Sequence, residues 1–453
     1  MIKMRLILAI WSAKLLAVVG KILGKKSSSK PGEIALKICP DIIERLKKNI
    51  KGEVFAVCGT NGKTTTNNLL CSALEKCGKT VICNKIGANM LSGIANVFAL
   101  SASVTGKLCA DNACFEIDEA SAVKVFDKIT PDVLIITNLF RDQLDRYGEI
   151  DMTADLLNRA IDKCGNVKLV LNGDDPICAG FAKNRKNVYF FGVSEPVLEQ
   201  PQEVSEGRYC QSCGAELSYN YYHYSQLGDY YCTNCGSRRP HIDFEATDVS
   251  IDDGLSFTIC KNEKIHVNYR GFYNIYNMLA VYSALKVSKT EFGSFKNVLA
   301  DYKPQIGRME EIDLGKPVIL NLAKNPAGFN QAIMTVCADK RKKDVIIAIN
   351  DHPGDGLDVS WLWDVVFEKL KDGNTGIIIS SGIRRYDLAL RLKYGDIPCS
   401  LCTDDMREAI EKCLSSDSEV VYALVNYTVL FKAENIMLEM KKELDEKAEK
   451  EEK

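Results

Sequence analysis

The feature that most constrains this chain is a short apolar segment ending in a glycine-rich turn, VFAVCGTNGKTTT at Val54–Thr66. Val54–Val57 is apolar and largely β-branched or aromatic, which is typical of a buried parallel strand. Apolar residues then recur at helical spacing within Thr65–Lys76. A strand, a glycine turn and a helix start form the context in which backbone N–H groups bind phosphate. The sequence therefore predicts an ATP site.

Individual roles follow from the chemistry of nucleotide loops. Lys63 is expected to contact the terminal phosphates, and the Thr64 hydroxyl is expected to bind Mg²⁺. The other predicted nucleotide contacts are Gly59, Thr60, Asn61, Gly62 and Thr65. Val57 stands where the general pattern G-x-x-x-x-G-K-[ST] has its first glycine. The alternative is a glycine turn before a polar helix start, with no ligand.

An acidic cluster follows a second predicted strand in Asn112–Ser121, NACFEIDEAS. Acidic groups at the carboxyl end of a parallel strand face the crevice where α/β proteins bind ligands. Glu116 is therefore a candidate Mg²⁺ ligand, and a solvated strand end is the alternative.

Further apolar strands alternate with helical stretches. They are predicted at Thr80–Cys83, Asp132–Thr137 and Lys168–Leu171, which indicates a doubly wound α/β domain. Polar residues after Asp132–Thr137 are expected to gather at the same sheet edge: Asn138, Arg141, Asp142 and Asp145.

Two CxxC pairs interrupt this domain. Cys210 and Cys213 are separated from Cys232 and Cys235 by 18 residues, an arrangement typical of a four-thiolate Zn²⁺ ribbon. The aromatic segment Tyr219–Tyr231 is expected to form its hairpin. Since protein fills all four positions, the zinc is predicted to be structural. Nucleic-acid binding by the ribbon is disfavoured because only Arg238 and Arg239 supply positive charge there.

A second α/β domain is predicted after the Tyr302–Gly307 linker. Its candidate strands are Pro317–Asn321, Asp344–Asn350, Gly376–Ser380 and Glu419–Val425, with helices at Trp361–Leu370 and Asp387–Lys393. The predicted domains are residues 1–302, with the ribbon inserted at about 206–240, and residues 303–453 with a charged tail.

Charge and cysteine content indicate which ligands and which cellular compartment fit the chain. A formal net charge of −2 argues against a general nucleic-acid surface. Most of the 18 cysteines are scattered without a repeating spacing, and a chain of this length needs no disulfides, which indicates a reducing cytoplasm.

The segment Met1–Leu23 is apolar with a basic start, but Lys14 interrupts it and no clear cleavage site follows. Lys3, Lys14 and Lys21 fall nearly on one line of a helix. Three interpretations remain open: docking on the protein, contact with an anionic membrane surface at the inner face of the plasma membrane, or a membrane span.

Four motifs in order resemble the Mur ligases: GTNGKTT at Gly59–Thr65, the EIDE segment, TNLFRDQLDRYGE at Thr137–Glu149 and NGDDP at Asn172–Pro176. This family forms amide bonds with ATP through an acyl phosphate. The resemblance spans Val54–Arg308. It implies that Lys63 and Thr64 bind phosphate and Mg²⁺, that Glu116 binds Mg²⁺, and that Asn274, Asn277 and Arg308 lie near the nucleotide.

Only residues 1–53 precede the loop, too few for the domain with which ordinary Mur ligases bind a UDP-linked precursor. The short N-terminus, the four-cysteine ribbon, NLAKNPAG after Leu320 and the GLDVSW segment resemble the MurT branch. These are the ligase subunits of lipid II isoglutaminyl synthase, in peptidoglycan biosynthesis. The resemblance implies ATP-dependent amidation of the D-glutamate α-carboxylate in the lipid II stem to D-isoglutamine.

The nitrogen donor implies a partner. The chain has four histidines, and none lies in a recognisable glutaminase motif, whereas glutaminases normally use a Cys–His pair. The resemblance implies a GatD-like glutamine amidotransferase subunit, whose histidine would be oriented by Asp358 of this chain. An N-cap role for Asp358, before a helix starting at Trp361, is an alternative compatible with the first.

Two other functions are considered. One is a free-standing ligase of the folylpolyglutamate or cyanophycin type, which would leave the ribbon and NLAKNPAG unexplained. The other is an ATP-binding assembly protein in which the ribbon is the functional surface, which predicts no ATP turnover linked to amidation.

Overall fold

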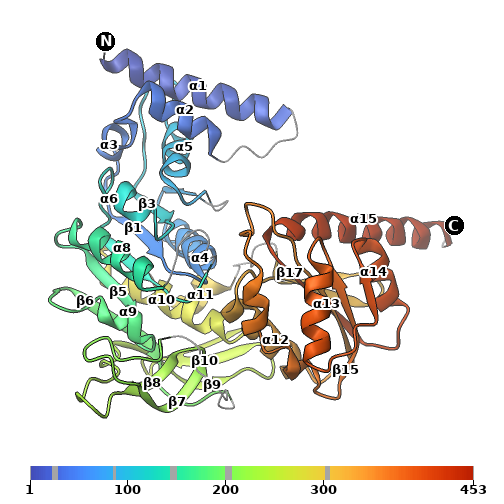
Figure 1. Cartoon of the computed structure of the whole chain (residues 1–453). Helices are drawn as coiled ribbons and strands as arrows, with labels where there is room; N and C mark the ends of the chain where they lie inside the picture. Colours follow the sequence, from blue (N-terminus) through green and yellow to red (C-terminus); the bar gives the residue numbers. More distant parts are fainter. Residues whose placement is uncertain are drawn as a thin grey trace.

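The computed structural model describes residues 2–22, 29–84, 88–142, 150–198, 207–300 and 307–451. Within these ranges the chain forms two α/β sheets and a separate two-stranded hairpin (Figure 1). Asp145, the boundary at 302/303 and residue 206 lie outside the described residues. The predicted division into domains therefore stays a prediction.

The first sheet is mostly parallel, with the phosphate loop near its middle. Its strand order is β11-β10-β9-β6-β5-β4-β1-β3-β2, and only β9, β10 and β11 pair antiparallel. The strands are β1 (Val54–Cys58), β2 (Val81–Cys83), β3 (Asn112–Glu116), β4 (Val133–Ile136), β5 (Lys168–Asn172), β6 (Val188–Val193), β9 (Phe244–Ser250), β10 (Leu255–Ile259) and β11 (Glu263–Val267).

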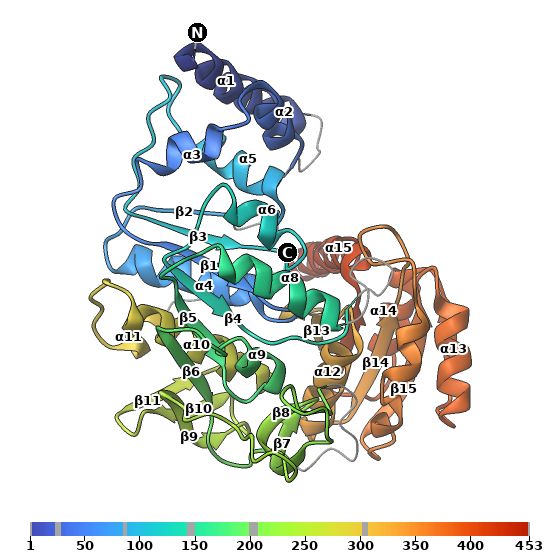
Figure 2. The ribbon, with the colours of Figure 1, turned by 60° about the vertical axis from the view of Figure 1, so that its left-hand side comes forward.

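Helices cover both faces of this sheet (Figures 1 and 2). Alternate residues of β1 show why: Ala56 belongs to the core beneath one helical layer, whereas Phe55 and Val57 belong to the core beneath the other. The first layer contains α5 (Leu91–Ser101), α6 (Ala122–Phe126), α8 (Ile150–Asp162) and α9 (Pro176–Gly180). The second contains α4 (Lys63–Lys76), α10 (Tyr273–Val287) and α11 (Phe295–Leu299).

Three N-terminal helices extend the first layer: α1 (Ile2–Ile22), α2 (Lys30–Ile38) and α3 (Ile42–Lys47). α1 packs on α2 and α5, so the helix predicted in Met1–Leu23 docks on the protein. Among the described residues, no helix is long and apolar enough to cross a membrane, which argues against the predicted alternative of a span.

The second sheet has the order β12-β13-β17-β14-β15-β16, with only β12 antiparallel to its neighbour. Its strands are β12 (Arg308–Asp313), β13 (Pro317–Leu322), β14 (Lys343–Ala348), β15 (Thr375–Ser381), β16 (Leu401–Thr403) and β17 (Val420–Val425). Helices α12 (Pro326–Ala338) and α13 (Arg385–Tyr394) cover one face; α14 (Met406–Leu414) and α15 (Tyr427–Glu451) cover the other.

The predicted α/β fold class is confirmed, with two differences in detail. The helix predicted at Trp361–Leu370 is instead two 3₁₀ turns, η1 (Ser360–Asp364) and η2 (Phe367–Leu370). The interruption is local: Val365 leaves the helical region with ψ of 131° and buries its side chain in the core. The antiparallel strands β9–β11 were not predicted, because their period-2 pattern is short and mixed with polar residues.

One helix contact offers a test of the N-terminal layer. Gly32 of α2 lies so close to α5 that an added Cβ would be 1.9 Å from the Ser92 carbonyl oxygen. We expect Gly32→Ala to lower the free energy of unfolding by about 1–3 kcal/mol through overpacking, although alanine favours helix. Gly293, which has open space around its Cα, is the matched control. Urea unfolding would measure both, and equal stability of the two variants would contradict the packing.

Candidate active site

The phosphate loop connects β1 to α4 across the carboxyl edge of the first sheet. Gly59 and Gly62 have φ of +119° and +84°, in the region that favours glycine. α4 begins at Lys63, two residues earlier than predicted, and no side chain caps its N-terminus. Its first N–H groups are therefore available to a phosphate.

Lys63 is buried, and its ammonium group is fully paired. Its Nζ donates to the Gly59 carbonyl oxygen at 2.5 Å, to the Thr60 carbonyl oxygen at 3.3 Å and to Glu119 Oε1 at 2.9 Å. Burial by itself lowers the Lys63 pKa, but the carboxylates of Glu119 and Glu116 outweigh it and raise this pKa above its usual value. Lys63 therefore carries its charge at neutral pH.

Thr64 and Glu116 come together at the same edge. Thr64 Oγ1 donates to Glu116 Oε2 at 2.7 Å, and the amide of Asn89 donates to Glu116 Oε1 at 3.1 Å. Asn84 holds the Glu116 backbone through hydrogen bonds to both its N–H and its carbonyl oxygen. Glu116 is buried, so it is not the solvated strand end considered from the sequence.

The segment after β4 fixes the outer side of the loop. Thr137 Oγ1 donates to the Asn61 carbonyl oxygen at 2.8 Å, and Asn138 Oδ1 accepts from the Asn61 N–H. Thr60 Oγ1 exchanges hydrogen bonds with the Phe140 backbone. Of the polar groups predicted at this edge, Asn138 holds the loop, and Arg141 and Asp142 line the adjoining cleft.

Two asparagines of α10 lie beneath the loop. An added Cβ at Gly62 would be 2.1 Å from Asn277 Oδ1, and Asn277 donates to Asn274 Oδ1 at 3.1 Å. Arg308 is the first residue of β12 in the second sheet. Burial raises the pKa of Tyr273, the residue before Asn274, and the positive charge of Arg308 opposes that rise. Asn277 thus lies against the loop, whereas Arg308 is placed near the start of α10. A nucleotide contact for any of the three stays a prediction.

The second sheet's domain meets the loop directly. Asn325, at the N-terminus of α12, exchanges amide hydrogen bonds with Asn61 at 3.1 and 3.3 Å. Lys324 pairs with Asp142 at 2.5 Å, and Arg141 pairs with Asp364 at 3.1 Å. A small cleft between the two sheets is lined by Arg141, Asp142, Lys324, Asn325, Pro326, Asp358 and Trp361.

Asp358 therefore lies on the C-terminal side of this cleft. Its carboxylate accepts the Ser360 N–H at 2.8 Å and the Ser360 hydroxyl at 2.9 Å. The hydrogen bond from the Ser360 N–H lowers the pKa of Asp358 most, followed by the one from the Ser360 hydroxyl. The positive charge of Arg141 lowers this pKa further. The N-cap residue of η1 is Val359, with no side-chain cap, so the predicted N-cap role of Asp358 is not observed in that form; Asp358 instead holds the turn just before η1 through Ser360, and its partly exposed carboxylate stays ionised.

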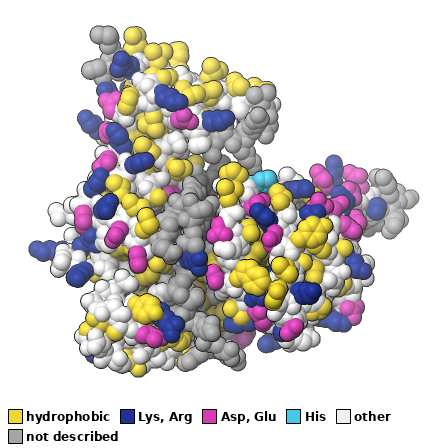
Figure 3. Space-filling view, in the orientation of Figure 1, with side chains coloured by type: hydrophobic (Ala, Val, Ile, Leu, Met, Phe, Trp, Pro, Cys, Tyr) yellow, Lys and Arg dark blue, Asp and Glu magenta, His cyan; other side chains and the backbone are white. Residues whose placement is uncertain are grey.

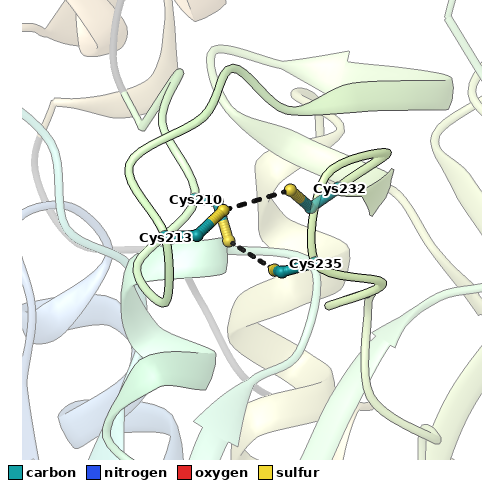
Figure 4. Close-up of side chains that lie close together, drawn as sticks. All are labelled: Cys210, Cys213, Cys232 and Cys235. Carbon is teal, nitrogen blue, oxygen red and sulfur yellow. Dashed lines mark hydrogen bonds between the residues drawn. The ribbon is translucent and has the colours of Figure 1, made fainter.

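The four predicted zinc ligands converge. The sulfurs of Cys210, Cys213, Cys232 and Cys235 all lie within 4.8 Å of one another (Figure 4). The hairpin β7 (Ser218–Tyr224) and β8 (Leu227–Tyr231) joins the two CxxC turns, as predicted.

The two CxxC turns have the same construction. Gly214 and Gly236 follow the second cysteine of each turn with φ of +71° and +74°, and their N–H groups donate to the carbonyl oxygens of Cys210 and Cys232. Hydrogen bonds from the Asn234 side chain and the Ala215 backbone lower the pKa of Cys213, whereas the neighbouring Cys213 and Cys210 sulfurs raise that of Cys235, so the four thiols titrate together. The donor set fits a tetrahedral Zn²⁺ site.

The NGDDP motif has a structural role. Asp174 is buried and accepts from Arg239 Nε at 2.6 Å, from the Tyr276 hydroxyl at 2.7 Å and from the Val193 N–H at 2.8 Å. Asp175 caps α9 through Ile177. The motif thus joins the ribbon arm to α10 and to the sheet.

Comparisons with known proteins agree with this architecture. Residues 57–285 match the Mur ligase middle domain, and residues 322–430 match the family described as MurT ligase C-terminal. The chain is 35% identical to the MurT subunit of lipid II isoglutaminyl synthase (glutamine-hydrolyzing) of Staphylococcus aureus, over 93% of this chain and 95% of that protein. It is 32% identical to the corresponding Streptococcus pneumoniae subunit, over 91% and 92%.

The chain belongs to the MurT family. It is therefore a Mur-type, ATP-dependent ligase subunit, as the resemblance implied. The fold is also similar to that of a pseudomurein peptide ligase type C from Methanothermus fervidus, with a TM-score of 0.71, 24% identity and coverage of 91% of this chain and 84% of that one.

Sequence reasoning missed part of the MurT site. Glu119 was seen only as part of an acidic strand end, yet it is the direct partner of Lys63. Asn84 and Asn325 were not singled out as site residues. An asparagine directly after β2 and one directly before Pro326 were the available signals, since both stand where a strand ends or a helix begins.

The close approach of Gly62 to α10 gives a test of the loop. We expect Gly62→Ala to weaken ATP binding by at least about tenfold. The new Cβ would collide with Asn277, and alanine disfavours the positive φ that Gly62 adopts. Calorimetric titration with ATP would measure the loss. Gly78→Ala, which has a similar positive φ at the end of α4 but open space around it, is the control. Unchanged ATP affinity in Gly62→Ala would contradict the assigned loop.

Proposed function

We propose that this chain amidates the α-carboxylate of D-glutamate in the lipid II peptide stem, giving D-isoglutamine in peptidoglycan biosynthesis. ATP phosphorylates the carboxylate, and ammonia displaces phosphate from the resulting acyl phosphate, with loss of a proton. The observation that carries the proposal is the pairing of a built phosphate loop with membership of the MurT family. Its relatives from S. aureus and S. pneumoniae are named as subunits of lipid II isoglutaminyl synthase.

The residues of the site support phosphoryl transfer to a carboxylate. A carboxylate is a poor electrophile, so it needs a leaving group before an amine can attack. The charged Lys63 and the exposed N–H groups of α4 would stabilise the transferring phosphoryl group. The Thr64 hydroxyl and Glu116 carboxylate would hold Mg²⁺, since both are hard oxygen ligands 2.7 Å apart. That ion would offset phosphate charge when bound.

The nitrogen would come from a separate glutaminase of the GatD type. Ammonia is mostly protonated at neutral pH, so it must be released close to the acyl phosphate. In the described structure, none of the four histidines is hydrogen-bonded to a cysteine: His223 is buried beside Val193, and His266 contacts Ser256. The described residues of this chain therefore contain no hydrogen-bonded Cys–His pair.

The surface formed by α13 and by η1, the turn that follows Asp358 in the chain, has the character of a partner interface. Tyr386, Leu390 and Tyr394 form an exposed stripe on α13, and Trp363 of η1 contacts Tyr394 with ring centroids 5.5 Å apart. Exposed aromatic groups of this kind are enriched in interfaces. Bound there, the partner's catalytic histidine could donate its N–H to Asp358, which would hold the ring and stabilise the imidazolium.

The remaining assignments belong to the same proposal. The four cysteines would hold a structural Zn²⁺ that stiffens the hairpin. We place the chain in the cytoplasm, at the inner face of the membrane that carries its lipid-linked substrate. A stand-alone amino-acid ligase is disfavoured, because the chain matches MurT subunits over nearly its whole length.

Asp358→Asn separates the two half-reactions. The amide oxygen can still accept from Ser360, so the start of η1 is preserved while the charge is lost. With partner, ATP and lipid II, we expect glutamine-dependent product to fall by roughly 10²–10⁴-fold and ammonium chloride to restore it. Mass spectrometry of the amidated stem and ADP release would measure both.

Lys63→Ala is the companion variant and should abolish product with either nitrogen source. If Asp358→Asn failed with both sources, the triad role would be excluded. If Lys63→Ala retained activity, the ATP site would be wrongly assigned.

The zinc assignment has a separate test. We expect about one zinc per chain by elemental analysis, and Cys213→Ser should lose the metal and lower the melting temperature by several degrees. Cys109→Ser, at an exposed cysteine outside the cluster, is the control. Wild-type protein free of zinc yet equally stable would contradict a structural metal.

A further inference from the structure

Helix α1 has an apolar face that the described protein leaves uncovered. Ala9, Ile10 and Ala13 are buried against the fold. On the opposite side, apolar residues recur every three or four positions and are 49–77% exposed: Met4, Leu8, Trp11, Leu15, Val18 and Ile22. This spacing places them along one line of the helix, so they form a continuous stripe. We call it the α1 stripe.

The helix is held so that this stripe faces outward. Lys14 Nζ donates to the Leu100 carbonyl oxygen at 2.7 Å, and Trp11 Nε1 donates to the Val104 carbonyl oxygen at 2.8 Å. Both acceptors lie in or just after α5. α1 forms one end of the molecule in two views (Figures 1 and 2), and hydrophobic side chains follow its outer edge at the top of Figure 3.

Charge indicates what covers the stripe. α1 contains no acidic residue, and Lys3, Arg5 and Lys21 are exposed. At 100° per residue, Lys3 and Lys21 project on one flank of the stripe and Arg5 on the other. A second copy of α1 would bring like charges together, which is unfavourable. An anionic lipid surface complements both the apolar stripe and its basic flanks.

We propose that α1 docks on an anionic lipid bilayer, lying along its surface with the α1 stripe among the acyl chains and Lys3, Arg5 and Lys21 at the headgroups. The indole of Trp11, whose N–H is already satisfied by Val104, can enter that region without leaving a donor unpaired. The helix anchors the protein without crossing the bilayer. This inference goes beyond the proposed reaction and does not depend on it.

Vesicle flotation tests the inference with the full-length protein. We expect binding to vesicles of phosphatidylglycerol and phosphatidylcholine, and weak binding to phosphatidylcholine alone. The double variant Leu15→Glu/Val18→Glu should reduce the partition coefficient by at least about tenfold. The double variant Lys3→Glu/Lys21→Glu should reduce it by a similar factor, but only on the anionic vesicles. The matched control is Met152→Glu/Leu444→Glu, at exposed apolar positions of α8 and α15.

Flotation of the variants decides whether the α1 stripe binds lipid. Equal melting temperatures and ATP affinities would show that the variants are folded, so lost flotation would then support the inference whether or not the chain amidates lipid II. No flotation of the wild-type protein, or flotation unchanged by Leu15→Glu/Val18→Glu, would overturn it. A dimer that the same variant dissociates would assign the stripe to a second copy instead.

Discussion

The buried charge of Lys63 determines how the active site is built. An ammonium group removed from water is stable only if strong acceptors surround it. The three protons of Lys63 meet two loop carbonyls and one oxygen of Glu119, and that same oxygen accepts the Gly59 N–H at 2.8 Å. One carboxylate therefore holds both the lysine and the loop backbone. The protein's own groups thus fix the shape of the loop.

Glu119 can do this only because of strand pairing. β3 runs parallel to β1, with Val57 opposite Glu116, so the residues after β3 emerge beside the glycine turn. A shift of one residue in this register would turn Glu116 away from Thr64. The second domain extends the same arrangement, since Asn325 caps α12 through Gly328 and also pairs with Asn61. The cleft between the sheets thus has Arg141 and Asp142, from the segment that holds the loop, on one side and Asp358 on the other.

The sequence was informative where structure is local. The strand at β1, the turn and α4 follow from short-range pattern, as do the strands at β13–β15 and β17, and the two CxxC turns follow from spacing. Contacts between distant segments could not be read in this way: Glu119 reaches Lys63 across 56 residues, and Asn325 reaches Asn61 across 264. The break between η1 and η2 was also hidden, because its apolar pattern is compatible with one continuous helix.

Three buried acidic residues near the carboxyl ends of strands, Glu116, Asp174 and Asp175, are distinguished by the hydrogen-bond partners of their oxygens. Asp174 meets the guanidinium of Arg239, so its charge is already balanced by the protein, and Asp175 is occupied by backbone N–H groups. Among the described residues, Glu116 also receives only neutral donors, from Thr64 and Asn89, but it lies beside the phosphate loop, whereas the donors of Asp175 belong to the start of α9 and to Leu139. A buried carboxylate without a hydrogen-bonded cation, next to a hydroxyl that can itself ligate a metal, has charge left to balance. Of the three, Glu116 is therefore the one suited to a divalent cation, and the other two are suited to joining segments of the fold.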